Sequence, residues 1–453
     1  MSALPSPGTS GSLVALALSG MLLVLLLWLG WRRPTWVLLL ALASLAIRPQ
    51  LLWSGPAVGY EWGLQHTLLV FALAMSALRY RIYRTANWPV LALLATFCLS
   101  VAFGNLHPEL SAGSMMTSLA VLALPFTFAQ VVLEPGSRRA CAMVIMLTPL
   151  LSVSTGAVLQ ALDVQPLMFF NSQTAEYRLQ GAAGIAAVFG MLAFAAFAVA
   201  LHEATQPGGR YAGYLAALNL VLVVLSGTRM AMFASGTLLV AYAMAAPRLR
   251  ERLWRYRGRA LLGAAIVMIA VVAYLPGLEL RLFADDAGTI RLSGRDVLWS
   301  FYLQELWQSP WFGRGVGAGF VAGDQVLNFI LNTPHNEYLH LLVNGGIVGF
   351  ALIAGGIVRW YRDLLAMSSP NDRTLLLTLI PALLLYASTD NLLTYPTGLG
   401  LFAYFGVVLT RPSPHPFPPD QAAAFGRASK APADALRELD RYRSSHGFAE
   451  CVP

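Results

Sequence analysis

Residues 180–201 read QGAAGIAAVFGMLAFAAFAVAL, and this stretch decides the fold class. It contains no Asp, Glu, Lys or Arg, and it is long enough to cross the hydrocarbon core of a bilayer, which takes about 20 helical residues. A backbone in lipid must satisfy its hydrogen bonds within its own segment, so such a run favours an α-helix. The stretch therefore predicts a transmembrane helix.

Similar apolar runs recur on both sides of this stretch. They lie at 12–31, 34–53, 62–78, 88–103, 115–133, 140–162, 211–226, 229–246, 260–276, 346–358, 374–389 and 397–410. The chain is 57% hydrophobic and 11% charged, whereas soluble domains are nearer a quarter charged. Because only 32–34 separate the first two runs and Arg48 interrupts the second, one of the pair is read as a partial span. The sequence predicts an all-α, polytopic membrane protein with 12 or 13 transmembrane helices.

Arginine-rich and arginine-poor connections alternate along the chain. The arginine-rich set holds Arg32, Arg33, Arg79, Arg81, Arg84, Arg138, Arg139, Arg210, the run PRLRERLWRYRGR at 247–259, Arg359, Arg362 and Arg373. Cytoplasmic loops carry the excess of basic residues in membrane proteins, so this set is predicted to face the cytoplasm. The C-terminal tail at 412–453 falls on the same side. We therefore expect a multi-pass protein of a bacterial inner membrane with a cytoplasmic C-terminus.

The two ends and the cysteines add little. Residues 1–12 lack the positive charges of a cleavable signal peptide, so the first apolar run is expected to remain as an anchor. Cys98 and Cys141 lie in apolar runs and Cys451 lies near the C-terminus, which gives no disulfide framework.

One long segment, 277–345, lies on the opposite side and carries many charged residues. It divides the chain into transmembrane helices at 1–276, the exterior loop at 277–345, the last helices at 346–411 and the tail. Within the loop, Val297, Leu298, Phe301, Leu306 and Trp307 fit an amphipathic helix at the membrane interface. The following glycines, Gly313, Gly315, Gly317 and Gly319, favour a loop that approaches other backbone closely.

Four exterior arginines stand out against the positive-inside bias: Arg229, Arg291, Arg295 and Arg314. Only three others, Arg48, Arg178 and Arg281, lie on this side. Arg229 begins an apolar run, where an ionisable group is costly unless it is paired or faces a wet cavity. Arg229 is explained equally well as a snorkelling arginine, whose guanidinium reaches the polar membrane interface. Each of the other three arginines, taken alone, is explained as a solvated charge on a loop. Together they favour a phosphate-binding site, since guanidinium groups match phosphate oxygens in a bidentate manner.

His335 follows Pro334 at a predicted junction between loop and helix. An imidazole is the side chain best suited to act as a general base near neutral pH, although a lone histidine is more often structural. His340 lies five residues later, on a different face of a helix, and is read as structural. That spacing is not the four residues of a helical metal site, and Asp285–Asp286 is read as a solvated pair, so no metal or cofactor is expected.

Four motifs together carry a resemblance to a known family. They are SGTRMA at 226–231, RxxxRDxxW at 291–299, PxxGRGxGxG at 310–319 and PHNEYLHLLVNGGIVGF at 334–350. This set resembles the O-antigen ligase family and its polymerase relatives. The resemblance implies a GT-C-like membrane glycosyltransferase in which a periplasmic loop covers a cavity for a glycan on undecaprenyl pyrophosphate.

The resemblance also implies roles for particular residues. Arg229 corresponds to the family's arginine at the outer end of a span, Arg295 to its loop arginine with Arg291 as the competing alignment, and His335 to its histidine before the last spans. Roles for Arg314 and Glu337 stay open. The chemistry agrees, because a pyrophosphate leaving group needs neutralisation by fixed cations and an acceptor hydroxyl needs a base.

The leading hypothesis is therefore an inverting, metal-independent ligase that transfers O-antigen to the lipid A–core oligosaccharide at the periplasmic face. Two relatives with the same donor remain alternatives: an O-antigen polymerase and a protein O-oligosaccharyltransferase. A transporter of lipid-linked sugars is a further alternative, disfavoured because the predicted spans are nearly uncharged. No nucleic-acid partner is expected.

Overall fold

The computed structural model describes residues 28, 32–47, 87–130, 135–171, 176–206, 209–246, 283–284, 289–290, 295–326, 334–393 and 398–405. The chain divides into one compact unit at Met1–Thr410 and a second at Arg411–Pro453. The predicted cytoplasmic tail lies outside the described residues, and so do the apolar runs at 62–78 and 260–276 and all of the run at 12–31 except residue 28.

The described part of the chain is mostly helical, which confirms the all-α class. Its α-helices are α2 (Pro34–Ser44), α4 (Trp88–Phe103), α5 (Ala112–Phe128), α6 (Pro135–Ala161), α7 (Ala186–Glu203), α8 (Arg210–Leu225), α9 (Arg229–Ala245), α13 (Arg295–Gln308), α14 (Ala318–Val326), α15 (Glu337–Met367), α16 (Pro370–Ala387) and α17 (Leu399–Tyr404). Two short antiparallel hairpins pair β1 (Met168–Asn171) with β2 (Glu176–Leu179) and β3 (Phe283–Ala284) with β4 (Thr289–Ile290).

Three of the described helices are long and apolar enough to cross a membrane, by length and composition. These segments are Ser137–Ala161, Ala186–Glu203 and Glu337–Met367. Five shorter apolar helices accompany them. Each apolar run that the structure describes overlaps one α-helix.

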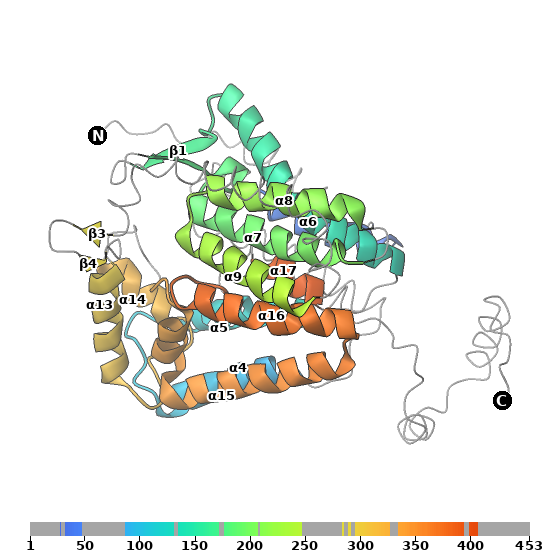
Figure 1. The fold of residues 1–453 in the computed structure, drawn as a ribbon. Helices are drawn as coiled ribbons and strands as arrows, with labels where there is room; N and C mark the ends of the chain where they lie inside the picture. The colour runs from blue at the N-terminus through green and yellow to red at the C-terminus, as the bar shows by residue number, and fades with distance from the viewer. Residues whose placement is uncertain are drawn as a thin grey trace, which may run out of the picture. The chain divides into compact units, whose positions relative to one another are not determined.

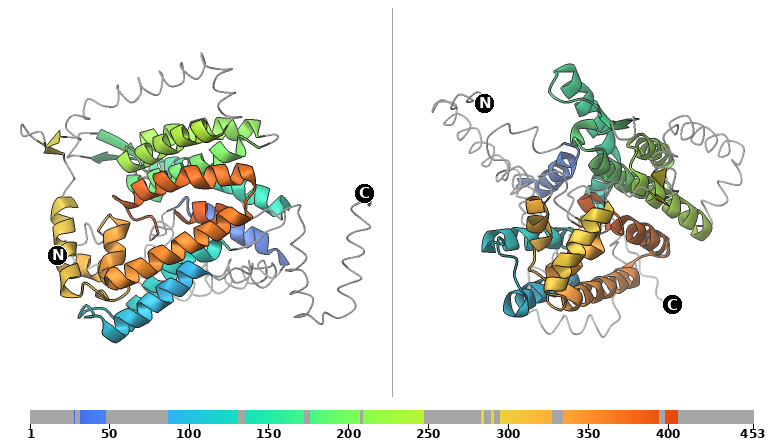
Figure 2. Two further views of the ribbon diagram at one scale, coloured as in Figure 1. Left: turned by 60° about the horizontal axis from the view of Figure 1, so that its bottom comes forward. Right: turned by 90° about the vertical axis from the view of Figure 1, so that its left-hand side faces the viewer.

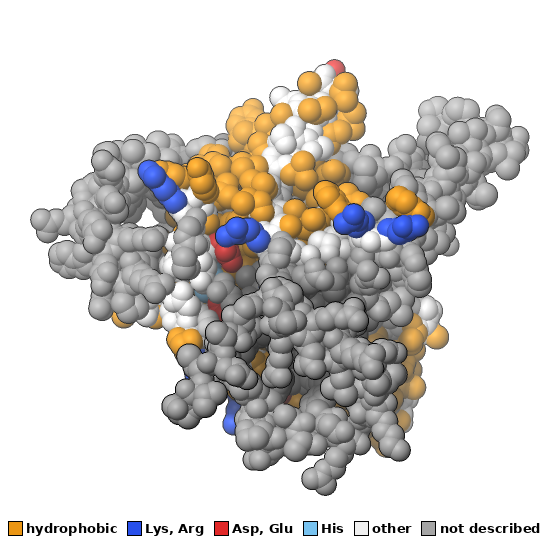
Figure 3. Space-filling view, turned by 90° about the vertical axis from the view of Figure 1, so that its right-hand side faces the viewer, with side chains coloured by type: hydrophobic (Ala, Val, Ile, Leu, Met, Phe, Trp, Pro, Cys, Tyr) orange, Lys and Arg blue, Asp and Glu red, His pale blue; other side chains and the backbone are white. Residues whose placement is uncertain are grey.

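Helix α7 lies at the centre of the bundle. Its alanines and phenylalanines, from Ala186 to Leu201, are almost all buried, and α6, α8, α9 and α17 pack around it. The long helices run side by side, while α13, α14 and the β1–β2 hairpin lie at one end (Figures 1 and 2). We call this the α13 end. The opposite end holds the turn between α15 and α16, and Figure 3 shows basic side chains across its apolar surface.

The bundle places the two predicted sets of arginines at different ends. Arg210 and Arg373 lie at the starts of α8 and α16, at the opposite end, whereas Arg229 and Arg295 begin α9 and α13 at the α13 end. For these described arginines, the alternation read from the sequence is therefore an alternation between the two ends of one helical bundle.

The run at 180–201 is not helical throughout. Residues Gly181–Ala183 form a 3-10 turn and α7 begins only at Ala186. Gly181 and Gly184 both have positive φ, 54° and 74°, a conformation that glycine adopts without strain. The side-chain amide of Gln165 donates to the carbonyl oxygen of Gly181 at 2.8 Å, which holds the turn against the end of α6.

The apolar run at 346–358 is the middle of a longer helix. Helix α15 begins at Glu337, where the side-chain oxygen of Asn336 caps it by accepting from the backbone N–H of Leu339 at 3.0 Å. The helix is interrupted at Gly346, whose φ of 63° and ψ of −169° are not helical. The predicted boundary at 345/346 therefore coincides with a break inside α15.

The loop at 310–315 fills this break. Backbone N–H groups of Ile347 and Val348 donate to the carbonyl oxygens of Pro310 and Trp311 at 2.8 and 3.0 Å. The N–H of Arg314 donates in turn to the carbonyl oxygen of Val343 at 2.8 Å. A Cβ atom at Gly346 would collide with the backbone of Trp311, so only glycine permits this approach. The glycine-rich stretch is thus the close-approach loop that the sequence predicts.

Glycines also bring α15 against α4. A Cβ atom at Gly356 would lie 2.8 Å from the carbonyl oxygen of Trp88, and one at Gly349 would lie 3.3 Å from the hydroxyl of Thr96. That hydroxyl donates to the carbonyl oxygen of Ala92 at 2.8 Å and lies 3.3 Å from that of Gly349. Small residues that let two helices approach closely are typical of helix packing in membranes.

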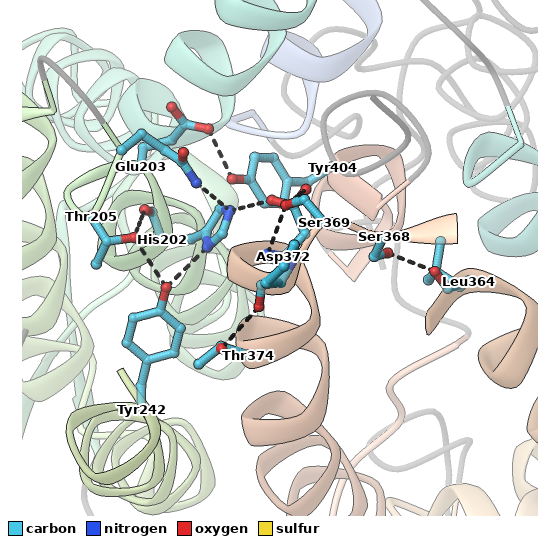
Figure 4. A network of polar contacts seen from close by, with 12 residues as sticks. His202, Glu203, Thr205, Tyr242, Leu364, Ser368, Ser369, Asp372, Thr374 and Tyr404 are labelled. Carbon is cyan, nitrogen blue, oxygen red and sulfur yellow. Dashed lines mark hydrogen bonds and ion pairs between the residues drawn. The ribbon is translucent and has the colours of Figure 1, made fainter. Parts of the chain in front are cut away.

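A buried polar cluster ties four helices together at the opposite end (Figure 4). The Nε2 atom of His202, on α7, lies 2.9 Å from a carboxylate oxygen of Asp372 on α16, and its Nδ1 atom lies 3.0 Å from the hydroxyl of Tyr242 on α9. The hydroxyl of Tyr404, on α17, donates to Glu203 at 2.9 Å. These contacts satisfy polar groups that would otherwise be buried unpaired.

Candidate functional site

The first turn of α13 is tied to the segment that carries His335. The indole N–H of Trp299 donates to the carbonyl oxygen of Pro334 at 2.8 Å. Arg295 begins the same helix, and residues four apart lie on the same helix face. Arg295 therefore stands one turn from a hydrogen bond to the residue before His335.

Packing inside the loop fixes the direction of α13. Leu298, Tyr302 and Leu306 are buried in a small core with residues of α14 and α15, and the hydroxyl of Tyr302 donates to the carbonyl oxygen of Gly319 at 2.7 Å. A helix with one buried face lies where the sequence predicts it, but that face differs in part from the predicted one, and a position at the membrane interface stays a prediction. Trp307 was expected on the apolar stripe, yet it is 73% exposed, because the buried positions follow a spacing of four residues from Leu298.

His335 has an unusual backbone conformation and a buried acidic partner. Its φ of 45° lies in the left-handed region, which non-glycine residues seldom adopt and which concentrates at functional sites. Its Nδ1 atom lies 3.2 Å from a carboxylate oxygen of Asp390, just after α16. The His335 side chain remains 15% exposed whereas that of Asp390 is 3% exposed, so the imidazole lies between the carboxylate and the open side.

Asp390 was not singled out by the sequence. It lies in Ser388-Thr-Asp-Asn391, which belongs to none of the four motifs. The carboxylate oxygen that faces His335 also accepts from the backbone N–H of Asn391 at 2.9 Å, which fixes its orientation. The available signal was an acidic residue directly after the uncharged apolar run at 374–389, because such a group beside a predicted span usually marks function.

Arg229 begins α9 at the α13 end and is half-buried. The positive charges of Arg295 and of Arg178, on strand β2, are near enough to repel its guanidinium. The structure therefore brings together two of the predicted arginines and adds Arg178, which the sequence placed on the exterior but did not select. Like charges held together away from water favour an anion between them.

Arg314 occupies a different setting. It is 5% exposed, its Nε atom donates to a carboxylate oxygen of Glu305 at 3.2 Å and its Nη1 atom donates to the carbonyl oxygen of Asn105 at 2.9 Å. Buried ion pairs with further hydrogen bonds are expensive to break. These contacts join α13 to the segment after α4, so they hold the loop in place.

Glu337 and His340 form a second buried pair. The Nδ1 atom of His340 lies 3.3 Å from one carboxylate oxygen of Glu337, and the other oxygen accepts from the backbone N–H of Leu393 at 2.9 Å. Both residues are buried, in agreement with the structural role predicted for His340. They fix the start of α15 to the segment that follows Asp390.

Arg291, Asp285 and Asp286 lie outside the described residues, so their predicted roles stay predictions. Within the described part, no group of three or more His, Cys, Asp or Glu side chains is arranged to hold a metal ion.

The arrangement brings two chemical features together at one end of the bundle. Guanidinium groups from α9, α13 and β2 gather where an anion can be bound, and the linked His335–Asp390 pair offers a base whose orientation is fixed. Such a site suits a reaction in which a negative charge develops on one group while a proton leaves another.

A family model described as O-antigen ligase matches residues 214–354, from α8 into α15. The comparison with curated proteins gives no match.

Proposed function

We propose that the chain is a member of the O-antigen ligase family, whose model matches residues 214–354, and that it transfers a glycan from undecaprenyl pyrophosphate to the lipid A–core oligosaccharide at the periplasmic face. The observation that carries the proposal is the pairing of His335 with Asp390 beside the helix that begins with Arg295. Under this proposal the α13 end is periplasmic and the whole chain, with 12 or 13 spans and a GT-C-like architecture, lies in the inner membrane. The segment 277–345 is then the periplasmic loop.

His335 acts as the general base in this proposal. An ionised carboxylate can only accept hydrogen bonds, so Asp390 assigns the ring proton to Nδ1 and leaves the lone pair on Nε2. Nε2 then takes the proton of the acceptor hydroxyl as its oxygen attacks the anomeric carbon. Asp390 stabilises the imidazolium that results. A general base of this kind contributes roughly 10²–10⁴-fold to the rate.

The arginines take the charge of the leaving group. As the bond between the acceptor oxygen and the anomeric carbon forms, the bond to the pyrophosphate breaks and its electron pair stays on the pyrophosphate. Arg229 and Arg295 lie together at the site, and fixed cations near a low-dielectric boundary stabilise such a charge strongly. Attack in line with the departing group inverts the anomeric carbon. Arg291 remains a proposed third contributor from the sequence.

Arg314 serves this site indirectly in the proposal. Its guanidinium is engaged by Glu305 and by the backbone of Asn105. Its role is therefore to hold the loop in position over the donor, and not to bind the pyrophosphate directly.

A deletion strain tests the function, because the possible activities leave different glycolipids. Accumulation of carrier-linked polymer with uncapped lipid A–core supports the ligase. A single repeat unit still attached to lipid A–core indicates a polymerase instead. Intact lipopolysaccharide together with unglycosylated periplasmic proteins indicates a protein oligosaccharyltransferase.

Complementation of that strain tests the base. A His335→Ala variant is expected to reach the membrane in normal amount without restoring capping, and a His415→Ala variant in the tail serves as the matched control. Full capping by His335→Ala would remove the imidazole from the mechanism.

A further inference from the structure

Arg178 lies on the hairpin at the α13 end, with its side chain directed toward the bundle. Strand β2 pairs antiparallel with β1, and neighbouring residues of a strand point to opposite faces. Tyr177 is 59% exposed and its ring meets that of Phe170 on the outer face. Arg178 takes the other face and is half-buried.

The stem of Arg178 rests on the turn that precedes Arg229. A Cβ atom at Gly227 would lie 3.1 Å from Cγ of Arg178 and 3.3 Å from its Cδ and Nε atoms. Gly227 has a φ of 62°, so a glycine is favoured there on conformational grounds as well. The side chain of Arg178 thus packs against the same short turn that leads into Arg229.

That turn is itself fixed. The hydroxyl of Ser226 accepts from the backbone N–H of Thr228 at 3.1 Å, and the hydroxyl of Thr228 donates to the carbonyl oxygen of Ala186 at 3.0 Å. The SGTR motif therefore does two things: it places Arg229 at the start of α9, and it forms a platform for a second guanidinium.

The Nε–H donor of the Arg178 guanidinium has no hydrogen-bond acceptor among the described residues. Its Nε atom is buried and, within the described part of the chain, makes no hydrogen bond. Burial lowers the pKa of Arg178, which shows that water does little to stabilise its charge. A buried donor without a partner is costly, and in a native structure it calls for an explanation such as a ligand.

We propose that Arg178 is a further pyrophosphate-binding residue, which receives the leaving group together with Arg229 and Arg295. The inference rests on the proposed function, because it assigns the anion to the carrier of that reaction. When the sugar–oxygen bond breaks, the pyrophosphate gains one negative charge. A third guanidinium at the same place then offsets the new charge, and the bound pyrophosphate in turn offsets the repulsion among the three arginines.

Binding of the product carrier tests this assignment without requiring turnover. The full-length protein in lipid nanodiscs is titrated with undecaprenyl pyrophosphate and, separately, with undecaprenyl monophosphate. For Arg178→Gln we expect binding of the pyrophosphate to weaken by about 10-fold or more, with a smaller change for the monophosphate. Arg178→Lys keeps the charge but not the planar fork, so it is expected to restore part of the loss.

Arg210→Gln is the matched control, because Arg210 is exposed at the opposite end of the bundle. Equal binding of pyrophosphate by Arg178→Gln and the wild-type protein would overturn the role of Arg178 alone. Equal weakening toward both lipids would also overturn it, since damage to the hairpin does not distinguish them. Absence of binding by the wild-type protein would instead count against the proposed function and remove this inference with it.

Discussion

At the scale of single residues, the pairing of His335 with Asp390 makes a sharp prediction. Asp390→Asn preserves shape, but its amide can donate to Nδ1 and so favours the tautomer with the proton on Nε2. We expect glycan transfer to fall by about 100-fold or more while the protein remains folded. The measurement is the rate of transfer by purified protein, with thermal unfolding as the test of integrity.

Asp363→Asn is the appropriate control for that variant. Asp363 pairs with Arg359 at 3.7 Å on a more exposed surface, where an ion pair contributes little. Its rate is expected to match that of the wild-type protein, and an Asp390→Asn rate equally close to wild type would contradict an orienting role for Asp390.

The sequence selected some residues of the candidate site and did not select others, for a physical reason. Arg229, Arg295 and His335 stand in short motifs, and a cation or imidazole at the outer end of a span is visible from hydropathy. Asp390 and Arg178 lie outside the matched segment 214–354 and join the site only through tertiary contacts. Arg314 shows the converse: the sequence selected it, but no local pattern revealed that its guanidinium would pair with the carboxylate of Glu305.

At the scale of elements, the contact between α13 and the start of α15 is the link between cations and base. Trp299→Phe removes the indole donor to Pro334 but keeps an aromatic ring in the same place. We expect transfer to slow by about 10-fold, the equivalent of one hydrogen bond, with little change in donor binding. Steady-state kinetics separate the two effects, and an unchanged turnover rate would show that this bond does not position His335.

The break in α15 yields a second prediction at this scale. Gly346→Ala places a methyl group against the backbone of Trp311 and forces an L-residue to a φ of 63°. With the ψ of −169°, this is a backbone conformation that essentially only glycine adopts, and it costs about 1–3 kcal/mol for an L-residue, so unfolding is expected at a clearly lower temperature.

The same helix contains a matched control. A Cβ atom at Gly355 would meet nothing within 4 Å, so Gly355→Ala is expected to leave stability unchanged or raise it by about 0.5–1 kcal/mol. Equal melting temperatures for the two variants would mean that the break at Gly346 is not needed to seat the loop.

Sequence patterns predicted the elements better than their ends. The absence of charge placed α7, α8, α9 and α16 within a few residues, because hydropathy reports what a helix can bury. The 3-10 turn at Gly181–Ala183 and the start of α15 at Glu337 depend on side-chain contacts and caps instead. The number of apolar residues in a run does not report such contacts.

At the scale of the whole molecule, the proposal requires that the α13 end face the periplasm. In a background without native cysteines, Trp311→Cys is expected to react with a membrane-impermeant maleimide in intact spheroplasts. Tyr211→Cys, at the opposite end, is expected to react only after permeabilisation. Both native side chains are well exposed, at 61% and 77%, so the two positions are comparable. The reverse pattern would exclude the proposed reaction, because the site would then face the cytoplasm.

The hydrogen bond between Arg314 and Val343 has a consequence for how this protein can vary. It holds the backbone at 314 next to the backbone at 343, so the residues between them form a loop that is closed at its base. Lengthening a loop whose base is closed is thermodynamically mild, at about 0.6 kcal/mol for each doubling of a flexible loop. Since this loop contains His335, we expect relatives to adapt to larger or smaller sugars here. They would gain or lose residues in the loop while the contact between 314 and 343 stays the same.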